Sequence, residues 1–365
     1  MSNTVFILGA GASKQAGAPL MKEFLDTAHN LWRLKAVGDA APSFELVFDA
    51  VSALQAVHSK SQLDLDNIES VFTTCEMAKT LGRFPGDAGK DIDGLIRALK
   101  VVIVKTLELT MRFPINERKI MCPEPYDKFV HLVRHLKGTA KPTQKVSLLT
   151  FNYDIALDFA LFDFGYEPDY GLGQRPQISN EFIPLLKLHG SLNWSETIPS
   201  VEEKAVIPWS LREYFQTYSV SQFSEVKYCH IPIGSQLAKR VPPPGAPITG
   251  EAVLVPPTWN KAETHRTLSL VWQKAAAALS EAENIFVIGY SMPEADAFFR
   301  YLYALGTVGK TMLKRFWVFD PDASGGVERR FAALLGPGAS VRFRYHQTDF
   351  ADALSIIQIA FPDKR

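Results

Sequence analysis

The chain has 365 residues, of which 47% are hydrophobic, enough to fill one large domain core or two smaller ones. Lys plus Arg and Asp plus Glu both total 39, so the formal net charge is zero and no overall basic field attracts nucleic acid. No run approaches the roughly 18 apolar residues of a membrane span and no signal-peptide pattern is present, so we expect a cytoplasmic protein with no direct nucleic-acid or membrane partner.

Three cysteines, Cys75, Cys122 and Cys229, lie far apart in the sequence and form no C-x-x-C pair. This spacing supports neither a disulfide framework nor a structural zinc site. We therefore expect buried, unreactive thiols and a protein that requires no metal.

The N-terminal region reads as a strand, a turn and a helix. Residues 4–8 are an apolar, β-prone run that ends at a glycine-rich turn, and a helical pattern follows from residue 13 to about residue 34. From about 36 to 140 the apolar residues mostly recur at helical spacing, as in the run that begins at Phe44. We interpret residues 36–140 as a helical insertion that needs a partner surface for its apolar faces.

After this stretch, short apolar runs alternate with helical patterns. The predicted strands cover residues 146–150, 184–188, 252–255, 284–289, 316–320 and 341–345. The predicted helices cover residues 155–162, 262–283, 295–305, 327–335 and 351–359. This alternation predicts an α/β fold with a Rossmann-like, doubly wound parallel sheet and a large helical insertion. Residues 195–250 are less regular and include Pro242 to Gly245, which suggests an irregular surface insertion or lid.

The first turn has the composition of a dinucleotide-binding loop. Gly9 and Gly11 follow a predicted strand, where residues without Cβ let the backbone approach a pyrophosphate. Such turns also serve packing alone. Lys14 stands where G-x-G-x-x-G has its third glycine, which disfavours a dehydrogenase, and the P-loop pattern of kinases does not occur.

Two further motifs follow predicted strands. Asn152 and Asp154 come directly after residues 146–150, where an open parallel sheet places its ligands, although both residues are also ordinary helix caps. His189, followed by Gly190, ends the next strand and is a candidate acid or base, although a single histidine is more often structural.

The last two strand ends carry Gly289 with Ser291, and Asp320. They offer backbone donors for phosphate and a carboxylate for the hydroxyls of a ribose, and each is also explained by turn and capping chemistry. Five such strand ends on one rim favour a binding site.

The order of these segments, GAGAS with AGAP, then TFNYD, LHGS, IGYS and FDPD, resembles the sirtuin family, and specifically its bacterial sirtuin-like NAD hydrolases. The likeness covers residues 1–20 and about 145–350, whereas 36–140 and 195–250 match only as insertions. It implies one sirtuin-like domain over residues 1–365.

The resemblance also implies roles for individual residues. Asn152 holds the nicotinamide ribose and the attacking water, and His189 is the general base. The remaining cofactor-binding residues are Gly9, Ala10, Gly11 and Ser13 at the pyrophosphate, Asp154 at the neighbouring loop or ribose, Gly289 and Ser291 in the phosphate-side loop, and Asp320 at the adenosine ribose. Deacylating sirtuins carry a four-cysteine zinc module after the histidine strand, where this chain has only Cys229.

The implied activity is therefore hydrolysis of NAD, as a substrate, to nicotinamide and ADP-ribose without a metal. The family acts in bacterial antiphage defence, which implies a regulated effector, a homo-oligomer, and control by a partner such as a helicase-type ATPase or an Argonaute-like protein. Two alternatives stay open: a non-catalytic sensor that binds NAD or ADP-ribose, and a protein deacylase or ADP-ribosyltransferase.

Overall fold

The structure is a computed structural model that describes residues 2–56, 63–173, 182–198, 205–217, 227–239, 247–255, 262–293 and 296–363. Its centre is a seven-stranded sheet of order β13-β12-β11-β1-β4-β6-β5, in which each pair of neighbours is parallel. The strands are β1 (Ser2–Leu8), β4 (Gln144–Thr150), β5 (Glu167–Asp169), β6 (Phe182–Lys187), β11 (Asn284–Ile288), β12 (Arg315–Phe319) and β13 (Phe343–His346). The predicted α/β class with a doubly wound, Rossmann-like parallel sheet is confirmed.

The order of the strands reverses next to β1. The chain runs from β1 to β4 and on to β5 and β6 on one side, and then returns to β11, β12 and β13 on the other side. Loops that leave the carboxyl ends of β1 and β11 therefore diverge, and ligands of open α/β sheets bind at such a switch point. All five residues of β11 are buried, as expected for a strand that is covered on both faces.

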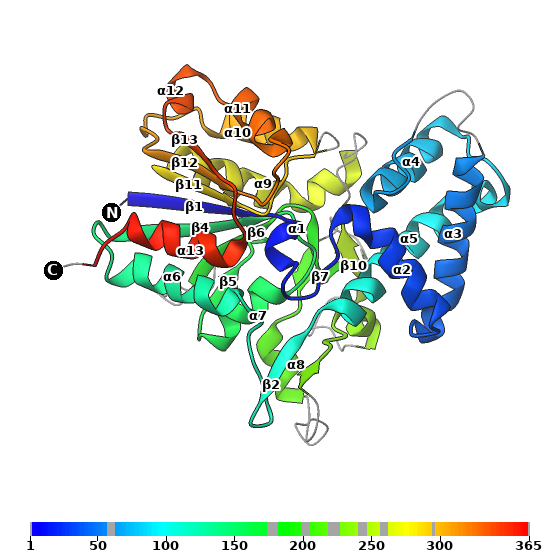
Figure 1. Ribbon diagram of the computed structural model, residues 1–365. Coiled ribbons are helices and arrows are strands. Elements are labelled where there is room, and N and C mark those ends of the chain that lie inside the picture. The colour runs from blue at the N-terminus through cyan, green and yellow to red at the C-terminus, as the bar shows by residue number, and fades with distance from the viewer. Residues whose placement is uncertain are drawn as a thin grey trace.

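Helices cover both faces of the sheet (Figure 1). One face carries α6 (Tyr126–Gly138) and α13 (Phe350–Ile359), and the ring of Phe6 in β1 lies 5.0 Å from that of Phe129 in α6. The other face carries α9 (Ala262–Ser280), α10 (Ala297–Gly306) and α11 (Gly326–Leu334). Two more helices complete the core, α7 (Ala156–Asp163), which packs beside α6, and the short α12 (Pro337–Ser340).

A helical layer stands at one end of the sheet and contains α2 (Phe24–Arg33), α3 (Ala41–Gln55), α4 (Ile68–Leu81) and α5 (Ile92–Thr110) (Figure 1). Phe44 and Val47 of α3 are fully buried in it, and α3 packs against α5. The rest of the range 36–140 has another structure, because β2 (Phe113–Asn116) and β3 (Lys119–Ile120) form a hairpin and α6 belongs to the core. The division of the chain into one domain with two insertions remains a proposal.

The continuous helix expected from residue 13 to residue 34 is wrong. The structure has a four-residue helix, α1 (Ala10–Ser13), then a turn, and α2 begins only at Phe24. Gly17 breaks the pattern because its φ is 99° and a Cβ there would lie 2.3 Å from the carbonyl oxygen of Thr110. The chain turns under the end of α5, where the Arg112 N–H donates to the Ala16 carbonyl oxygen at 2.8 Å.

The strand predicted at residues 252–255 exists as β10 (Ile248–Leu254), but it lies outside the parallel sheet. It pairs antiparallel with β7 (Gly190–Thr197), which in turn pairs with β8 (Val206–Pro208). The described parts of 195–250 also hold α8 (Leu211–Thr217), the two-residue β9 (Tyr228–Cys229) and a 3-10 helix at Gly234–Lys239. Pro242 to Gly245 lie outside the described residues.

Candidate functional site

A cleft of about 810 Å³ opens at the carboxyl ends of the parallel strands, where β1 and β11 diverge. The fold therefore places the cleft where the strand order predicts a ligand. Eight of the ten residues nominated from the sequence line it, namely Ala10, Gly11, Asn152, Asp154, His189, Gly289, Ser291 and Asp320.

The other two nominated residues, Gly9 and Ser13, lie behind the cleft surface and hold the first turn in place. A Cβ on Gly9 would lie 2.5 Å from the Cα of Tyr290, so no side chain fits there. Ser13 is fully buried, and its Oγ lies 2.8 Å from the hydroxyl of Tyr126. The resemblance implied that Gly9 and Ser13 line the pyrophosphate, whereas the geometry gives them a supporting position behind the cleft surface.

The first glycine turn packs directly against the turn after β11. The Gly11 N–H donates to the carbonyl oxygen of Gly289 at 2.9 Å. Gly289 has a φ of 60°, and a Cβ there would lie 2.4 Å from the nitrogen of Ala12. The glycines are therefore needed for the contact between the two loops, which also leaves a backbone surface that a pyrophosphate can approach.

Asn152 links β4 to the first turn. Its Nδ2 donates to the carbonyl oxygen of Gly9 at 2.9 Å and to Ser13 Oγ at 3.0 Å. A carbonyl oxygen only accepts, so this contact fixes which end of the amide faces Gly9. The Oδ1 end is left as the acceptor that the side chain presents to a donor such as a ribose hydroxyl.

Asp154 bonds to the backbone that leads into α7, although the N-cap of that helix is Ile155. Its Oδ1 accepts a hydrogen bond from the Ala156 N–H at 2.9 Å, at the start of α7. Burial raises the pKa of Asp154, against the opposing effects of the Lys187 ammonium and the Ser13 hydroxyl. The geometry thus suits orientation of the loop better than direct contact with a ribose.

His189 lies at the inner end of the cleft and is only 2% exposed. Its Nε2 is 3.9 Å from Oδ1 of Asp296, which is also 2% exposed. The Tyr290 hydroxyl donates to the other oxygen of Asp296 at 2.5 Å. The His189 ring stands edge-on to Phe151, with centroids 5.1 Å apart. A buried imidazole thus lies beside a buried carboxylate that a tyrosine orients.

Sequence reasoning missed Asp296, because its partner His189 is far away in the chain. It also missed Glu69 and Asn67 at the start of α4, which line the cleft from the helical layer. Asn67 caps α4 by accepting from the Glu69 N–H at 2.9 Å. Burial, and after it the negative charges of Glu69 and Asp296, raise the pKa of Tyr153, which also lines the cleft. No local pattern could have placed a helix from residues 68–81 over this site.

The outer part of the cleft carries the phosphate-side candidates. The main-chain oxygen of Ser291 accepts from Arg330 Nε at 2.9 Å, which brings a guanidinium to this loop. Asp320 is 9% exposed, its Oδ1 accepts from the Asp322 N–H at 3.0 Å, and burial raises its pKa. The Val327 N–H, in the first turn of α11, donates to Oδ2 of Asp322 at 2.8 Å. Asp320 thus combines a turn contact with a place on the cleft wall.

The described residues contain no group of three or more His, Cys, Asp or Glu side chains arranged to hold a metal ion. Cys75 and Cys122 are buried and Cys229 is partly buried. Burial raises the pKa of Cys75 to about 12 and that of Cys229 to about 11. In the described part of the chain, no helix has the length and apolar character that a membrane crossing requires.

No family model and no curated protein matches the chain. Among solved structures, a mutant Sir2 homologue in complex with ADP-ribose is 12% identical, with a TM-score of 0.39 over 97% of this chain and 90% of that chain. A Sir2 homologue in complex with NAD is 14% identical, with a TM-score of 0.35 over 97% and 87% of the two chains. Sir2Tm bound to a propionylated peptide is 12% identical, with a TM-score of 0.36 over 98% and 92%. At TM-scores this low, the function has to be argued from the residues of the cleft itself.

Proposed function

We propose that the protein binds NAD in the cleft and hydrolyses its nicotinamide–ribose bond. The observation that carries the proposal is the meeting of Asn152 and His189 in one cleft at the switch point of a doubly wound sheet. The pyrophosphate would lie over the backbone of Ala10, Gly11 and Gly289, and the adenosine ribose beside Asp320. The nicotinamide ribose would lie at the inner end, between Asn152 and His189.

In this reaction the C1′–N bond of NAD breaks, and its electron pair leaves with nicotinamide. Water adds to C1′ and loses one proton, so the products are nicotinamide, ADP-ribose and a proton. His189 would accept that proton, and Oδ1 of Asn152 would position a ribose hydroxyl or the water. The carboxylates of Glu69 and Asp296 would stabilise the positive charge that develops on the ribose.

A second candidate function, a non-catalytic sensor of NAD or ADP-ribose, is favoured by the hydrogen bonds of Asn152. Its amide nitrogen already serves Gly9 and Ser13, so the residue has a structural role that needs no reaction. Protein deacylation, the third candidate, would require an acylated peptide as co-substrate.

One experiment separates the three functions. The purified full-length protein is incubated with NAD, with and without an acetylated peptide, and nicotinamide and ADP-ribose are quantified by chromatography. A hydrolase releases both products in equal amounts without peptide, a deacylase releases nicotinamide only with peptide, and a sensor binds NAD without turnover. Release that depends on the peptide would contradict the proposal.

The resemblance to antiphage NAD hydrolases extends the proposal to a cytoplasmic, regulated effector that forms a homo-oligomer. A helicase-type ATPase or an Argonaute-like protein would control it. We also propose that catalysis needs no metal. We further propose that the protein holds no structural zinc, and elemental analysis that finds one tightly bound zinc per chain would contradict this point.

A further inference from the structure

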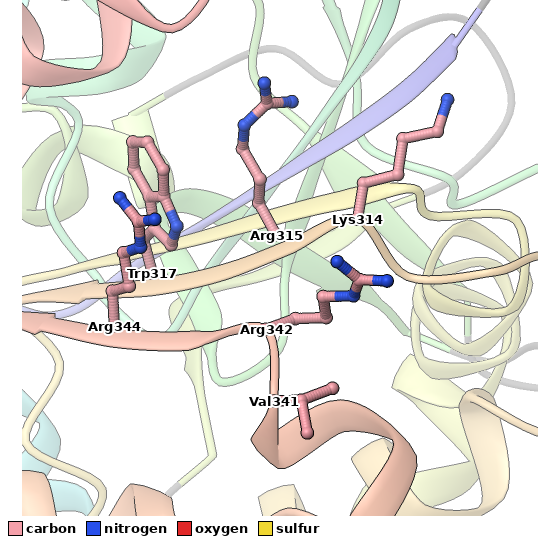
Figure 2. A pocket seen from close by; sticks show the side chains of 6 residues that line it. All are labelled: Lys314, Arg315, Trp317, Val341, Arg342 and Arg344. Atoms are coloured by element: carbon pink, nitrogen blue, oxygen red, sulfur yellow. The ribbon is translucent and has the colours of Figure 1, made fainter.

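A basic pocket lies at the edge of the sheet opposite the cleft. Its volume is about 230 Å³, and its lining consists of Lys314, Arg315, Trp317, Val341, Arg342 and Arg344 (Figure 2). Arg315 begins β12, and the residue that follows the other end of this strand, Asp320, lines the cleft. The basic pocket is therefore separate from the proposed NAD site.

The register of β12 and β13 concentrates the positive charges on one face of the sheet. Trp317 is opposite Arg344, and the Phe316 N–H donates to the Arg342 carbonyl oxygen at 3.1 Å. Because alternate residues of a strand share a face, Arg315, Arg342 and Arg344 lie on the same face as Trp317. Like charges on adjacent strands repel each other. The formal net charge of the whole chain is zero, so this local concentration of positive charge does not reflect a generally basic protein.

Aromatic rings hold two of the guanidinium groups. The Arg315 guanidinium lies 5.8 Å from the centroid of the Trp317 ring and 5.0 Å from that of Phe361, and the Arg344 guanidinium lies 5.5 Å from Trp317. Arg315 also donates to Oδ1 of Asn284 at 2.9 Å. Figure 2 shows Arg344 beside the Trp317 ring, with Arg342 further along the same strand segment. These planar donor groups are therefore partly ordered before any ligand arrives.

Little negative charge offsets the cluster. Glu283 pairs with Lys314 at 2.7 Å, and within the described ranges no ion pair joins Arg342 or Arg344 to a carboxylate. Burial and the positive charge of Arg344 lower the pKa of Arg315, and the same two causes lower the pKa of His346. The cluster thus has an excess of positive charge that a bound anion would neutralise.

We propose that the basic pocket binds a small anion with two adjacent phosphate groups, through Arg315, Arg342 and Arg344. Planar guanidinium groups match phosphate oxygens with paired hydrogen bonds. The volume, 230 Å³ against 810 Å³ for the cleft, suits a diphosphate group better than a whole dinucleotide. Two guanidinium groups already lie near the Trp317 ring, so recognition rests on the phosphates rather than on stacking of a base. The ligand that carries the two phosphate groups is either inorganic pyrophosphate or the diphosphate end of a nucleotide.

The test is isothermal titration calorimetry of the full-length protein with pyrophosphate, with ADP, and with a single-stranded oligonucleotide. The decisive variant is R342Q/R344Q, which changes two exposed side chains of the pocket. The matched control is R33Q/R134Q, which removes two exposed positive charges on α2 and α6, away from both the pocket and the cleft. Circular dichroism melting confirms that both variants fold, and the single variant Arg342→Gln serves if the double variant does not.

The expected result is that the pocket variant binds pyrophosphate at least about tenfold more weakly than the wild type, whereas the control binds it as the wild type does. If ADP binds as tightly as pyrophosphate, the ligand can be the diphosphate end of a nucleotide. If pyrophosphate binds and ADP does not, the ligand is the inorganic ion. A pocket variant that binds pyrophosphate as tightly as the wild type would place the anion elsewhere, such as in the cleft, and overturn the proposal. No binding to the wild type, or an oligonucleotide that binds more tightly than pyrophosphate through the pocket, would also overturn it. None of these outcomes depends on NAD hydrolysis.

Discussion

The Nδ2 atom of Asn152 lies 2.9 Å from the carbonyl oxygen of Gly9, and this hydrogen bond ties the carboxyl end of β4 to that of β1. The same nitrogen donates to Ser13 Oγ at 3.0 Å. With both hydrogens of the amide engaged, only the oxygen is available to a ligand. Asn152 thus has a structural role and a proposed catalytic role, and the two can be measured separately.

We expect Asn152→Ala to lower the free energy of unfolding by about 1–3 kcal/mol, because the part-buried acceptors at Gly9 and Ser13 lose their donor. The control is Asn30→Ala on the exposed face of α2, which should change stability by no more than about 0.5 kcal/mol. Urea unfolding of both variants gives the comparison. Equal stabilities would show that the link between β4 and the first turn contributes nothing.

The parallel sheet was predictable because each buried strand is a short apolar run and each is followed by turn residues at its carboxyl end. The convergence of Asn152, His189 and Asp320 followed from that arrangement, since parallel strands place these ends on one rim. The break at Gly17 was not predictable from the same pattern. It depends on a close approach to the Thr110 carbonyl oxygen, which only the packed chain defines.

The supporting residues of the site were also beyond the sequence. The pairing of His189 with Asp296 and the approach of Glu69 join segments that are distant in the chain, and no local spacing encodes them. Ser13 was expected at the pyrophosphate because the resemblance of the first motif to the sirtuin family implies that position. Its burial against Tyr126 became apparent only when α6 was placed on the sheet.

We expect Asp296→Asn to lower kcat for nicotinamide release by about 10-fold to 100-fold and to leave KM for NAD within about 3-fold. The carboxylate lies 3.9 Å from His189 Nε2 and lies at the inner end of the cleft, away from the expected phosphate contacts. Asp39→Asn, an exposed change in the helical layer, is the matched control. Tyr290→Phe removes the hydroxyl that holds Asp296 and should show a weaker form of the same kcat effect. A change in KM alone would assign Asp296 to NAD binding instead of to the chemical step.

Asp322 provides a pH-dependent contribution to stability. Hydrogen bonds from the Ser324 hydroxyl, and then from the N–H groups of Val327 and Ser324, lower the pKa of Asp322 to about 2. Because the folded-state pKa lies below the unfolded value of about 3.9, the stabilisation is present above pH 4 and is lost as the pH falls toward 2.

Asp322→Asn should therefore lose less stability than the wild type between about pH 4 and pH 2. Thermal melting at a series of pH values in this window measures the difference. Asp39→Asn should follow the wild-type profile. If Asp322→Asn loses as much stability as the wild type over this pH range, the contacts of Asp322 at the start of α11 do not depend on its charge.

The decisive prediction concerns Asn152 and His189 together. If both act on one ribose, Asn152→Ala and His189→Ala should each lower nicotinamide release by at least about 100-fold. Groups that act as a unit are not additive, so the double variant should be scarcely slower than the slower single variant. His131→Ala on the exposed face of α6 is the control and should keep the full rate.

The same variants should still bind NAD, because the backbone of Ala10, Gly11 and Gly289 that would hold the pyrophosphate is unchanged. Calorimetry with NAD checks this, and urea unfolding separates the stability loss of Asn152→Ala from a loss of chemistry. The rates are measured in a preparation whose wild type turns over NAD, with any activating partner present. If the rates of both variants stay within a few-fold of the wild-type rate, Asn152 and His189 take no part in the reaction. Binding without turnover in the wild type, under every condition in which the partner is present, would instead make the cleft a sensor of NAD.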